Sequence, residues 1–357
     1  MNSSTKLVLV AGILLALVSL SFLPAAAQSY SVTDLGTLGG QYSGAFAVND
    51  RGQVVGLADL SNTTQRAFIW SAGTGMRNLG LLHASDSYSI AYGINNSAQV
   101  VGVSGDFGFL WQSGSGMQDL GSLGGVGTIA YGINSLGDVV GSSNTIDGST
   151  HAFFWTASDG IQDIGTLGSA SIAYAVNDSE EVVGLYVLPD LVIVRAFKWR
   201  QATGMVDLGT LGGPTSSAYA INANGQIAGV TDTAALQTVA FVWDSTRGMQ
   251  SLNFQGTVGF GLSASGQVVG YLSIGSSQSG FIWTKSSGVQ NLSGLIVPRG
   301  TFVSQANGIN RSGQIAAQSD KIHALLLTPH YDGLGGGLAQ ILPIDVIGAI
   351  SIGYEHN

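Results

Sequence analysis

The sequence predicts an all-β fold, a seven-bladed β-propeller built from four-stranded blades. Three observations lead to this prediction. A hairpin phrase recurs seven times, all six tryptophans fall in one register, and a single outer-strand phrase precedes the first complete unit. The tryptophans follow one another at intervals of 40–44 residues, and a period of 40–45 residues with four short strands is typical of a propeller blade.

The first two strands of each unit come from the phrase A-x-x-I/V-N-x-x-G-Q-V-V-G, which first occurs at 45–56 and last at 306–317. Its turn needs a residue in the left-handed region, usually Gly. Five copies carry that Gly: Gly52, Gly137, Gly225, Gly266 and Gly313. Ala98 and Glu180 replace it in the other two, and we expect strain there.

Two further residues of this phrase have predicted structural roles. The Asn before the turn can bond the turn backbone as an Asx-turn; it is Asn49, Asn95, Asn134, Asn177, Asn222 and Asn310, with Ser263 in the remaining copy. A Gly that closes the second strand indicates a bulge or a close approach of backbone; it is Gly56, Gly102, Gly141, Gly184, Gly229 and Gly270.

The third strand of each unit is the short phrase A-F-x-W. Phe and Trp lie two residues apart, so they share one face of the strand, and we expect them to fill the gap between neighbouring blades. The phrase ends at Trp70, Trp111, Trp155, Trp199, Trp243 and Trp283, and Leu327 takes the Trp position in the seventh copy.

The fourth strand comes from G-M-x-D-L-G-x-L-G-G, and it decides how the ring closes. In the fifth unit the four strands are expected at 218–221, 226–230, 239–243 and 249–252. A fourth-strand phrase stands alone at 31–36, and the chain ends its repeats at 302–328 with three strands. The sequence therefore predicts that the N-terminal strand completes the last blade as its outermost strand, with first strands lining a central channel. An open stack or a β-solenoid is the alternative, although solenoids repeat at shorter intervals.

The composition and the two chain ends predict where the protein is located and which classes of partner it excludes. Residues 1–27 have a positive residue, an apolar run and a final Ala-Ala-Ala, which predicts a secretory signal peptide; a retained membrane anchor is the alternative. The propeller is expected at 28–328, and residues 329–357 form a Gly-rich joint and tail. The net charge of −9 argues against nucleic acid. We expect a monomer that is secreted or on the cell surface, without a membrane span after cleavage.

The candidate site residues are carboxylates. One Asp occurs in the segment between the second and third strands of six units: Asp59, Asp106, Asp147, Asp190, Asp232 and Asp320. They would lie at one mouth of the channel and favour a cationic ligand there; the alternative is that Asp is simply a common turn residue. No catalytic motif or metal-binding motif is recognisable, so no cofactor is expected, and calcium at the Asp set is the one option left open.

His151 and His323 begin third strands at positions where other units carry Arg, Val or Ser, which indicates a structural role at the blade edge. Asp34, Asp119, Asp163 and Asp207 precede Leu-Gly or Ile-Gly in the fourth-strand phrase, and Asn or Ser replaces them in other units. This exchange indicates hydrogen bonding to local backbone.

The phrases resemble the bacterial extracellular repeat family named for its His-Ala-Phe core, the HAF repeat. The triplet stands at His151-Ala152-Phe153, and L-G-T-L-G-G occurs at 35–40 and 208–213. The resemblance covers about residues 30–328 and implies an exported repeat protein, but it transfers no catalytic residue. We therefore expect a binding module for an extracellular protein or glycan. A polysaccharide hydrolase or lyase, and a purely structural envelope protein, are the alternatives.

Overall fold

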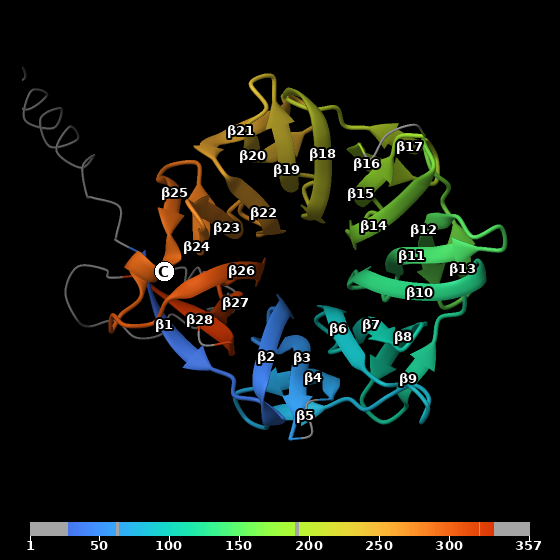
Figure 1. Ribbon diagram of the computed structural model, residues 1–357, viewed down its shortest axis with the longest axis horizontal. Coiled ribbons are helices and arrows are strands. Elements are labelled where there is room, and N and C mark those ends of the chain that lie inside the picture. The colour runs from blue at the N-terminus through green and yellow to red at the C-terminus, as the bar shows by residue number, and fades with distance from the viewer. Residues whose placement is uncertain (1–27, 62–63, 190–192, 321, 332–357) are drawn as a thin grey trace, which may run out of the picture. The chain divides into compact units, whose positions relative to one another are not determined.

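The computed structural model describes residues 28–61, 64–189, 193–320 and 322–331. The signal peptide expected at 1–27 and the tail beyond residue 331 lie outside these residues. Seven antiparallel four-stranded sheets surround a central axis as blades, which confirms the predicted seven-bladed β-propeller (Figure 1). The one helical element in the described part of the chain is the 3-10 helix η1 (Leu292–Leu295).

The innermost strand of each blade borders the central channel, as the sequence predicts (Figure 1). These strands are β2 (Gly39–Val48), β6 (Ser89–Ile94), β10 (Gly124–Ile133), β14 (Ala170–Val176), β18 (Gly212–Ile221), β22 (Thr257–Leu262) and β26 (Val303–Ile309). The second strands are β3 (Val54–Leu60), β7 (Val100–Ser104), β11 (Val139–Thr145), β15 (Val182–Val187), β19 (Ile227–Thr233), β23 (Val268–Ile274) and β27 (Ile315–Ser319).

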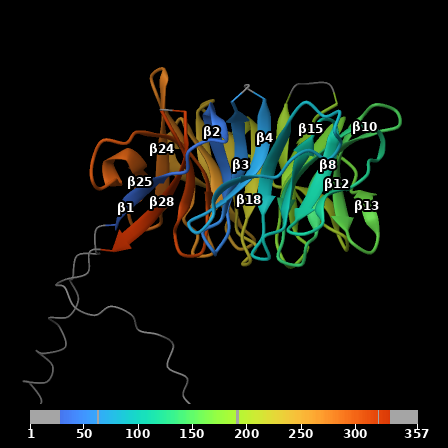
Figure 2. The ribbon, with the colours of Figure 1, turned by 90° about the horizontal axis from the view of Figure 1, so that it is seen from below.

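The third strands carry the aromatic phrase. They are β4 (Gln65–Ser71), β8 (Phe107–Gln112), β12 (Thr150–Thr156), β16 (Val194–Arg200), β20 (Thr238–Asp244), β24 (Ser277–Thr284) and β28 (Ala324–Tyr331). The outermost strands are β5 (Gly75–Asn78), β9 (Gly116–Asp119), β13 (Gly160–Asp163), β17 (Gly204–Asp207), β21 (Gly248–Gln255), β25 (Gly288–Asn291) and, for the last blade, β1 (Gln28–Asp34). Seen edge-on, the connecting turns gather at two opposite faces of the ring (Figure 2).

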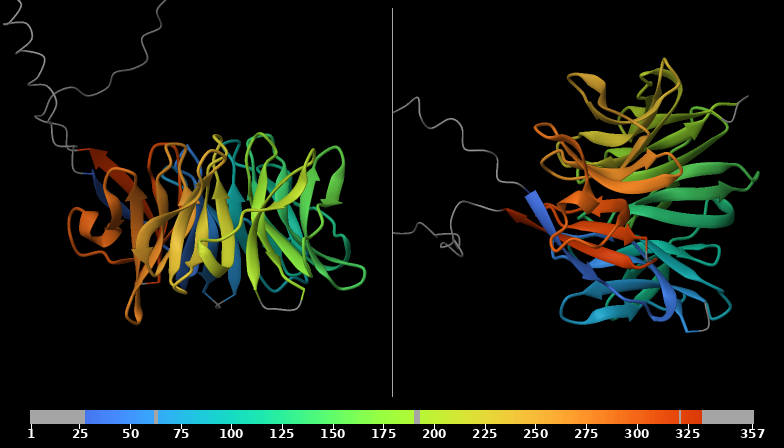
Figure 3. Two further views of the ribbon diagram at one scale, coloured as in Figure 1. Left: turned by 90° about the horizontal axis from the view of Figure 1, so that it is seen from above. Right: turned by 60° about the vertical axis from the view of Figure 1, so that its left-hand side comes forward.

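The N-terminal strand closes the ring, and the prediction of an outermost strand is confirmed. The last blade has the order β1-β28-β27-β26, so the blue strand β1 lies beside the red strand β28 (Figure 3). His323 of the third strand and Asp34 of β1 join the two strands through an Nδ1–Oδ2 contact of 3.0 Å. The third strand of this blade also runs beyond the expected end at 328, to Tyr331.

The innermost strands of alternate blades begin earlier than the sequence predicts. β18 starts at Gly212, whereas the expected start was 218, because Gly212 already pairs with Thr233 before a bulge that ends at Ser216. β2 and β10 begin at the same Gly-Gly pair, at Gly39 and Gly124. The L-G-G phrase is thus the start of an innermost strand in these blades, although the sequence analysis placed it at the end of the fourth-strand phrase.

Each junction between blades is an apolar cluster drawn from two neighbours. Phe109 and Trp111 of the second blade, for example, pack against Val55, Ala67 and Ile69 of the first. The Phe position is fully buried in six blades: Phe68, Phe109, Phe153, Phe197, Phe241 and Phe281. The prediction that Phe and Trp fill the gap between blades is confirmed, and burial of such aromatic area is the main stabilising contribution at each junction.

A second link between blades is a buried hydroxyl near the start of an innermost strand. Ser216 accepts a hydrogen bond from the N–H of Ala196 in the preceding blade at 2.9 Å and donates to the carbonyl of Gly209 at 2.7 Å. The same N–H acceptor recurs at Ser43, Ser89, Ser171 and Thr257. Each of these bonds gives a partner to a backbone N–H where one blade meets the next.

Candidate functional site

A bulge in every innermost strand builds the wall of the central channel. In the first blade Ala45 pairs with Gly56 and Ala47 pairs with Val55, so the residue between them, Phe46, has no partner across the strand. The same shift occurs at the same place in all seven blades. A bulge re-aims the side chain of its extra residue, and here it changes the direction of one side chain per blade.

In six blades a Gly of the second strand lies opposite this bulge. A Cβ at Gly56 would lie 1.8 Å from the carbonyl oxygen of Gly44, and the other five glycines of this set meet a carbonyl oxygen at 1.8–2.0 Å. Both parts of the sequence prediction, a bulge and a close approach of backbone, are confirmed. In these six blades a side chain would collide with the bulged strand, whereas the seventh blade has Ala317 at the equivalent position, paired with Ala306.

The re-aimed residue is aromatic in six blades, and the six rings form an arc around the channel. Neighbouring ring centroids lie 5.1–5.5 Å apart, with interplanar angles of 32–62°. The arc consists of Phe46, Tyr92, Tyr131, Tyr174, Tyr219 and Phe260, and Asn307 takes the seventh position. Asn307 instead donates to the carbonyl of Ala45 at 2.7 Å and accepts from Gln305 at 2.6 Å.

The tyrosine hydroxyls of this arc are neutral groups. Burial, helped by the neighbouring Tyr131 and Tyr88, raises the pKa of Tyr92 to about 12. Burial also raises the pKa of Tyr131, Tyr174 and Tyr219. The arc therefore adds no negative charge to the channel wall.

Toward the hairpin turns the channel wall becomes aliphatic. The residue before each turn Asn lines an axial cavity of about 260 Å³, and these residues are Val48, Ile94, Ile133, Val176, Ile221, Leu262 and Ile309. A second cavity of about 220 Å³ lies at the mouth and shares Ile133, Val176 and Ile221 with the first. The two cavities are adjacent, and their volumes taken together are within the range of small-molecule sites, roughly 300–1,000 Å³.

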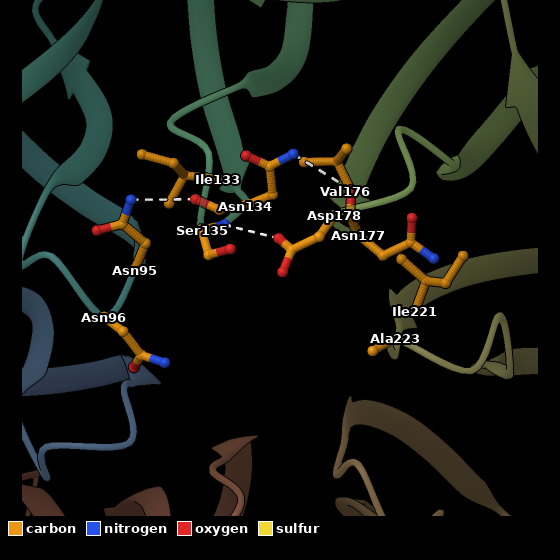
Figure 4. A pocket seen from close by; sticks show the side chains of 10 residues that line it. All are labelled: Asn95, Asn96, Ile133, Asn134, Ser135, Val176, Asn177, Asp178, Ile221 and Ala223. Carbon is orange, nitrogen blue, oxygen red and sulfur yellow. Dashed lines mark hydrogen bonds between the residues drawn. The ribbon is translucent and has the colours of Figure 1, made fainter.

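The turn asparagines form a ring of hydrogen bonds around this mouth. Asn134 accepts from the N–H groups of Leu136 and Asp138 at 3.0 and 2.9 Å, which confirms the predicted Asx-turn. Its Nδ2 also donates to the carbonyl of Asn177 in the next blade at 3.2 Å (Figure 4). The sequence reading missed this second role, because the acceptor belongs to another repeat.

The ring has six of seven possible links in the described turns. Equivalent bonds of 2.9–3.2 Å join Asn49 to Asn95, Asn95 to Asn134, Asn177 to Asn222, Asn222 to Ser263, and Asn310 to Asn49. Ser263 has no Nδ2 group with which to reach Asn310. Both ends of each Asn amide are thus committed to structure, so the asparagines build the mouth and leave ligand contacts to other side chains.

The residue that follows each Asn forms the outer rim of the mouth. Asp50 accepts from the Asn96 side chain at 2.9 Å and from the Arg311 N–H at 2.8 Å, so both of its oxygens are bonded. Asp178 accepts from the Ser135 N–H at 2.9 Å through one oxygen (Figure 4). In the described part of the chain the second Asp178 oxygen makes no hydrogen bond, and Asp178 is the charged residue that lines the mouth cavity.

One buried carboxylate lies beside the ring. Glu181 accepts from Asn177 at 2.9 Å and forms an ion pair with Lys198 at 2.7 Å. Its partial burial acts to raise the pKa of Glu181, but the hydrogen bonds from Lys198 and Asn177, and the charges of Lys198 and Arg200, outweigh this effect. The pKa of Glu181 is therefore lowered from 4.5.

The predicted Asp set lies at the other end of the ring, away from this mouth. Asp106, Asp147 and Asp320 are exposed in turns between second and third strands, while Asp59 and Asp232 are in the second strands themselves. Asp190 lies outside the described residues. Asp232 accepts from Thr215 and Thr238 of its own blade, and Asp147 accepts from the Ser149 N–H. Within the described ranges no three His, Asp or Glu side chains are grouped closely enough to hold a metal ion. Whether these carboxylates bind a ligand stays a prediction.

The recurring Asp of the fourth strand has the structural role that the sequence indicates. Asp207 accepts from the Gly209 N–H at 2.8 Å, and Ser251 and Asn291 make the corresponding bond in their blades. Two of these carboxylates also bind the His that begins the adjacent third strand: His151 contacts Asp163 at 2.8 Å, and His323 contacts Asp34. These pairs join neighbouring strands at the outer edge of a blade.

Comparison with known proteins shows the class of protein and not its family. No known protein family matches the chain, and no curated protein matches it in sequence. In its described residues, no helix has the length and apolar character that crossing a membrane requires. The molecule is a seven-bladed β-propeller.

Solved structures resemble the chain at the level of fold. An oligogalacturonate lyase in complex with manganese is 12% identical with a TM-score of 0.56, over 86% of this chain and 98% of that one. Virginiamycin B lyase from Staphylococcus aureus is 9% identical with a TM-score of 0.55, over 84% and 99%. The extracellular domain of the one-component system BT4673 from B. thetaiotaomicron is 10% identical with a TM-score of 0.51, over 85% of this chain but 40% of that one. At these identities the likeness establishes the propeller fold alone.

Proposed function

We propose that the protein is an exported β-propeller that binds an extracellular ligand in its axial channel, entered at the hairpin mouth. The observation that carries this proposal is the pair of adjacent cavities, with an aromatic and aliphatic wall and a polar rim. Such a wall with a few polar groups at its edge is the usual composition of a ligand site. The bulge that builds it recurs in all seven blades, at positions where bulges commonly re-aim side chains for function.

Export and membership of the HAF-repeat family belong to the same proposal. They are supported by the signal-peptide pattern at 1–27 and by His151-Ala152-Phe153 with its related triplets. Expression of the full chain in a bacterial host, followed by fractionation and N-terminal sequencing, tests export. A mature start at Gln28 outside the cytoplasm supports it, and an uncleaved chain in the cytoplasm contradicts it.

A plug at the mouth tests the binding site. Ala223 is exposed and lines the mouth cavity, so Ala223→Trp should obstruct the entrance without disturbing the core. Ala235→Trp is the matched control, since Ala235 is exposed in a turn at the opposite end. A ligand found by glycan-array and small-molecule screening should lose binding in A223W and keep it in A235W. The reverse pattern would place binding at the Asp end and contradict the proposal.

The enzymatic alternative remains a polysaccharide hydrolase or lyase that uses loop carboxylates. Incubation with oligogalacturonate and other polysaccharides, with and without Mn²⁺, followed by analysis of product length, tests it. Release of shorter products that is abolished by Asp106→Asn and Asp147→Asn would favour the enzyme. Calorimetric titration with Ca²⁺ of the same double variant tests a cation at the Asp set. A purely structural envelope role would leave every ligand and substrate screen without a response.

A further inference from the structure

Resting on the proposed function, we infer that the channel takes a linear amphiphile, with an unbranched apolar chain along the axis and an ammonium head at Asp178. The inference names the class of ligand, which the proposed function leaves open. It follows from the apolar wall of the channel, from Asp178 at its rim, and from the turn amides, whose hydrogen-bonding groups are already used within the protein.

The inner part of the channel suits an apolar occupant. Five of the seven aliphatic residues that surround it are only partly buried, although they lie at the centre of the ring; their remaining exposed surface faces the channel. No Asp, Glu, Lys or Arg is among the residues that line this cavity. A charged group placed there would lose its hydration without gaining a partner, whereas an alkyl chain would cover apolar surface that water now contacts.

The shape of the wall selects an unbranched chain. Seven strands contribute equivalent positions around one axis, so the apolar wall is a tube bounded on all sides by Val48, Ile133, Ile221 and their counterparts. The aromatic arc continues this tube, with rings 5.1–5.5 Å apart and in contact with one another. A chain lying on the axis is surrounded by this apolar wall, to which Phe46, Tyr92, Tyr131 and Phe260 contribute rings.

A sugar chain fits the mouth less well. A glycan needs many hydrogen-bonding partners, and the most numerous polar groups here are the turn amides. Asn95, Asn134 and Asn177 each use Oδ1 for their own turn and Nδ2 for the next blade. Sugar hydroxyls would have to break these bonds, and a buried group left unpaired costs about 1–3 kcal/mol.

The rim selects the head group. Asp178 holds one oxygen against the Ser135 N–H and leaves the other toward the mouth cavity, whereas both oxygens of Asp50 are bonded. An ammonium group donates hydrogen bonds and carries the opposite charge, so it is the complementary partner for a free carboxylate oxygen. The second blade has Asn96 at the position equivalent to Asp178, so the fold accepts Asp178→Asn.

Calorimetry with a homologous ligand series tests the inference. The probes are n-alkylamines from butyl to decyl, with n-alkyl sulfates and n-alkanols of equal length, all below their critical micelle concentrations. Each added methylene should tighten binding about fourfold until the tube is full, because burial of one methylene contributes about 0.8 kcal/mol. The amines should bind more tightly than the sulfates of equal length.

Three variants give the controls. D178N should remove the preference for the amine while the dependence on chain length remains. A223W should abolish binding of every length. Asp159→Asn, the same change in an exposed turn between the third and outermost strands of its blade, should behave as wild type. Circular dichroism and the urea midpoint verify that each variant is folded.

The possible outcomes separate the inference from the proposed function. Fourfold steps with a head-group preference lost in D178N support both. Binding of a glycan or peptide that A223W blocks, with no response to the amphiphiles, overturns the inference and leaves the proposed function intact. Amphiphile binding that A223W does not block contradicts both, and so does the absence of any ligand that A223W blocks.

Discussion

The incomplete ring of turn amides predicts a stabilising substitution, Ser263→Asn. Six Asn side chains link their blade to the next, but Ser263 cannot reach the carbonyl of Asn310. The turn of Ser263 has the same backbone bonds as the others, from Gly266 N–H to Ser263 and from Ser263 N–H to Gln267. An Asn should therefore fit without strain and donate to both Asn310 and the side chain of Gln267, as Asn222 does in its own turn.

The expected gain follows from these two bonds. A typical hydrogen bond contributes about 0.5–1.5 kcal/mol net, and ordering the Asn side chain opposes part of that, so S263N should raise the free energy of unfolding by about 1–2 kcal/mol. With an m value of about 3 kcal/mol/M, the urea midpoint rises by roughly 0.3–0.7 M. Tryptophan fluorescence reports unfolding, because six blades carry one Trp each.

Two further variants make this reasoning refutable. Asn222→Ser keeps the turn acceptor, as the natural Ser263 does with Gln267 N–H at 3.0 Å, but loses the link to the next blade, so the midpoint should fall. Ser245→Asn makes the same change as S263N in an exposed turn and should leave the midpoint unchanged. If S263N and N222S both unfold where the wild type does, the amide links contribute nothing and the reasoning fails.

Three other substitutions probe the wall, the charge and the core. Gly56→Ala places a Cβ against the bulged strand of its blade and should lower the urea midpoint, whereas Gly73→Ala, with no atom nearby, should unfold like wild type in urea. The pKa of Glu181 is lowered from 4.5, so its stabilising contribution is present above that pH and disappears as the pH falls through the folded-state pKa. The urea midpoints of wild type and Glu181→Gln should accordingly become equal as the pH falls. If the two midpoints still differ at low pH, the ion pair with Lys198 is not the cause of the difference. Phe153→Ala, at a fully buried position, should cost about 3–5 kcal/mol in the same assay, and a cost below 1 kcal/mol would mean that the blade junction collapses around the cavity.

Most of the fold could be predicted from the sequence because its determinants are local and repeated. The left-handed turn residue is one example: Gly52 and Gly225 have φ of +71° and +72°, and even the substitutes Ala98 and Glu180 adopt φ of +59° and +56°. Closure of the ring followed from the number of strand phrases. These features depend on residues within one unit, so one sequence with seven copies reveals them.

The candidate site was harder to predict because it depends on register and on neighbouring units. An aromatic residue follows the first residue of the hairpin phrase in six copies, and this was the available signal. Without the bulge, Tyr131 would take its direction from simple strand alternation, and a shift of one residue reverses the face on which a side chain lies. The second bond of Asn134 reaches a carbonyl 43 residues away, and no local rule connects the two.

The position of the Asp set shows a different limit of sequence reasoning. The structure places Asp106 and Asp147 at the end opposite the hairpin turns, and the sequence analysis expected them around one mouth of the channel. It did not reveal their distance from the axis, because a turn between second and third strands lies outside the innermost strand of its blade. The hairpin turns, by contrast, join the innermost strand to the second, and they alone bring side chains such as Asp178 to the channel mouth. We therefore expect a channel site in this propeller to have a rim formed by the residue that follows each turn Asn. This residue varies between blades, with only Asp and Ala occurring twice. The residues that all blades share maintain the ring.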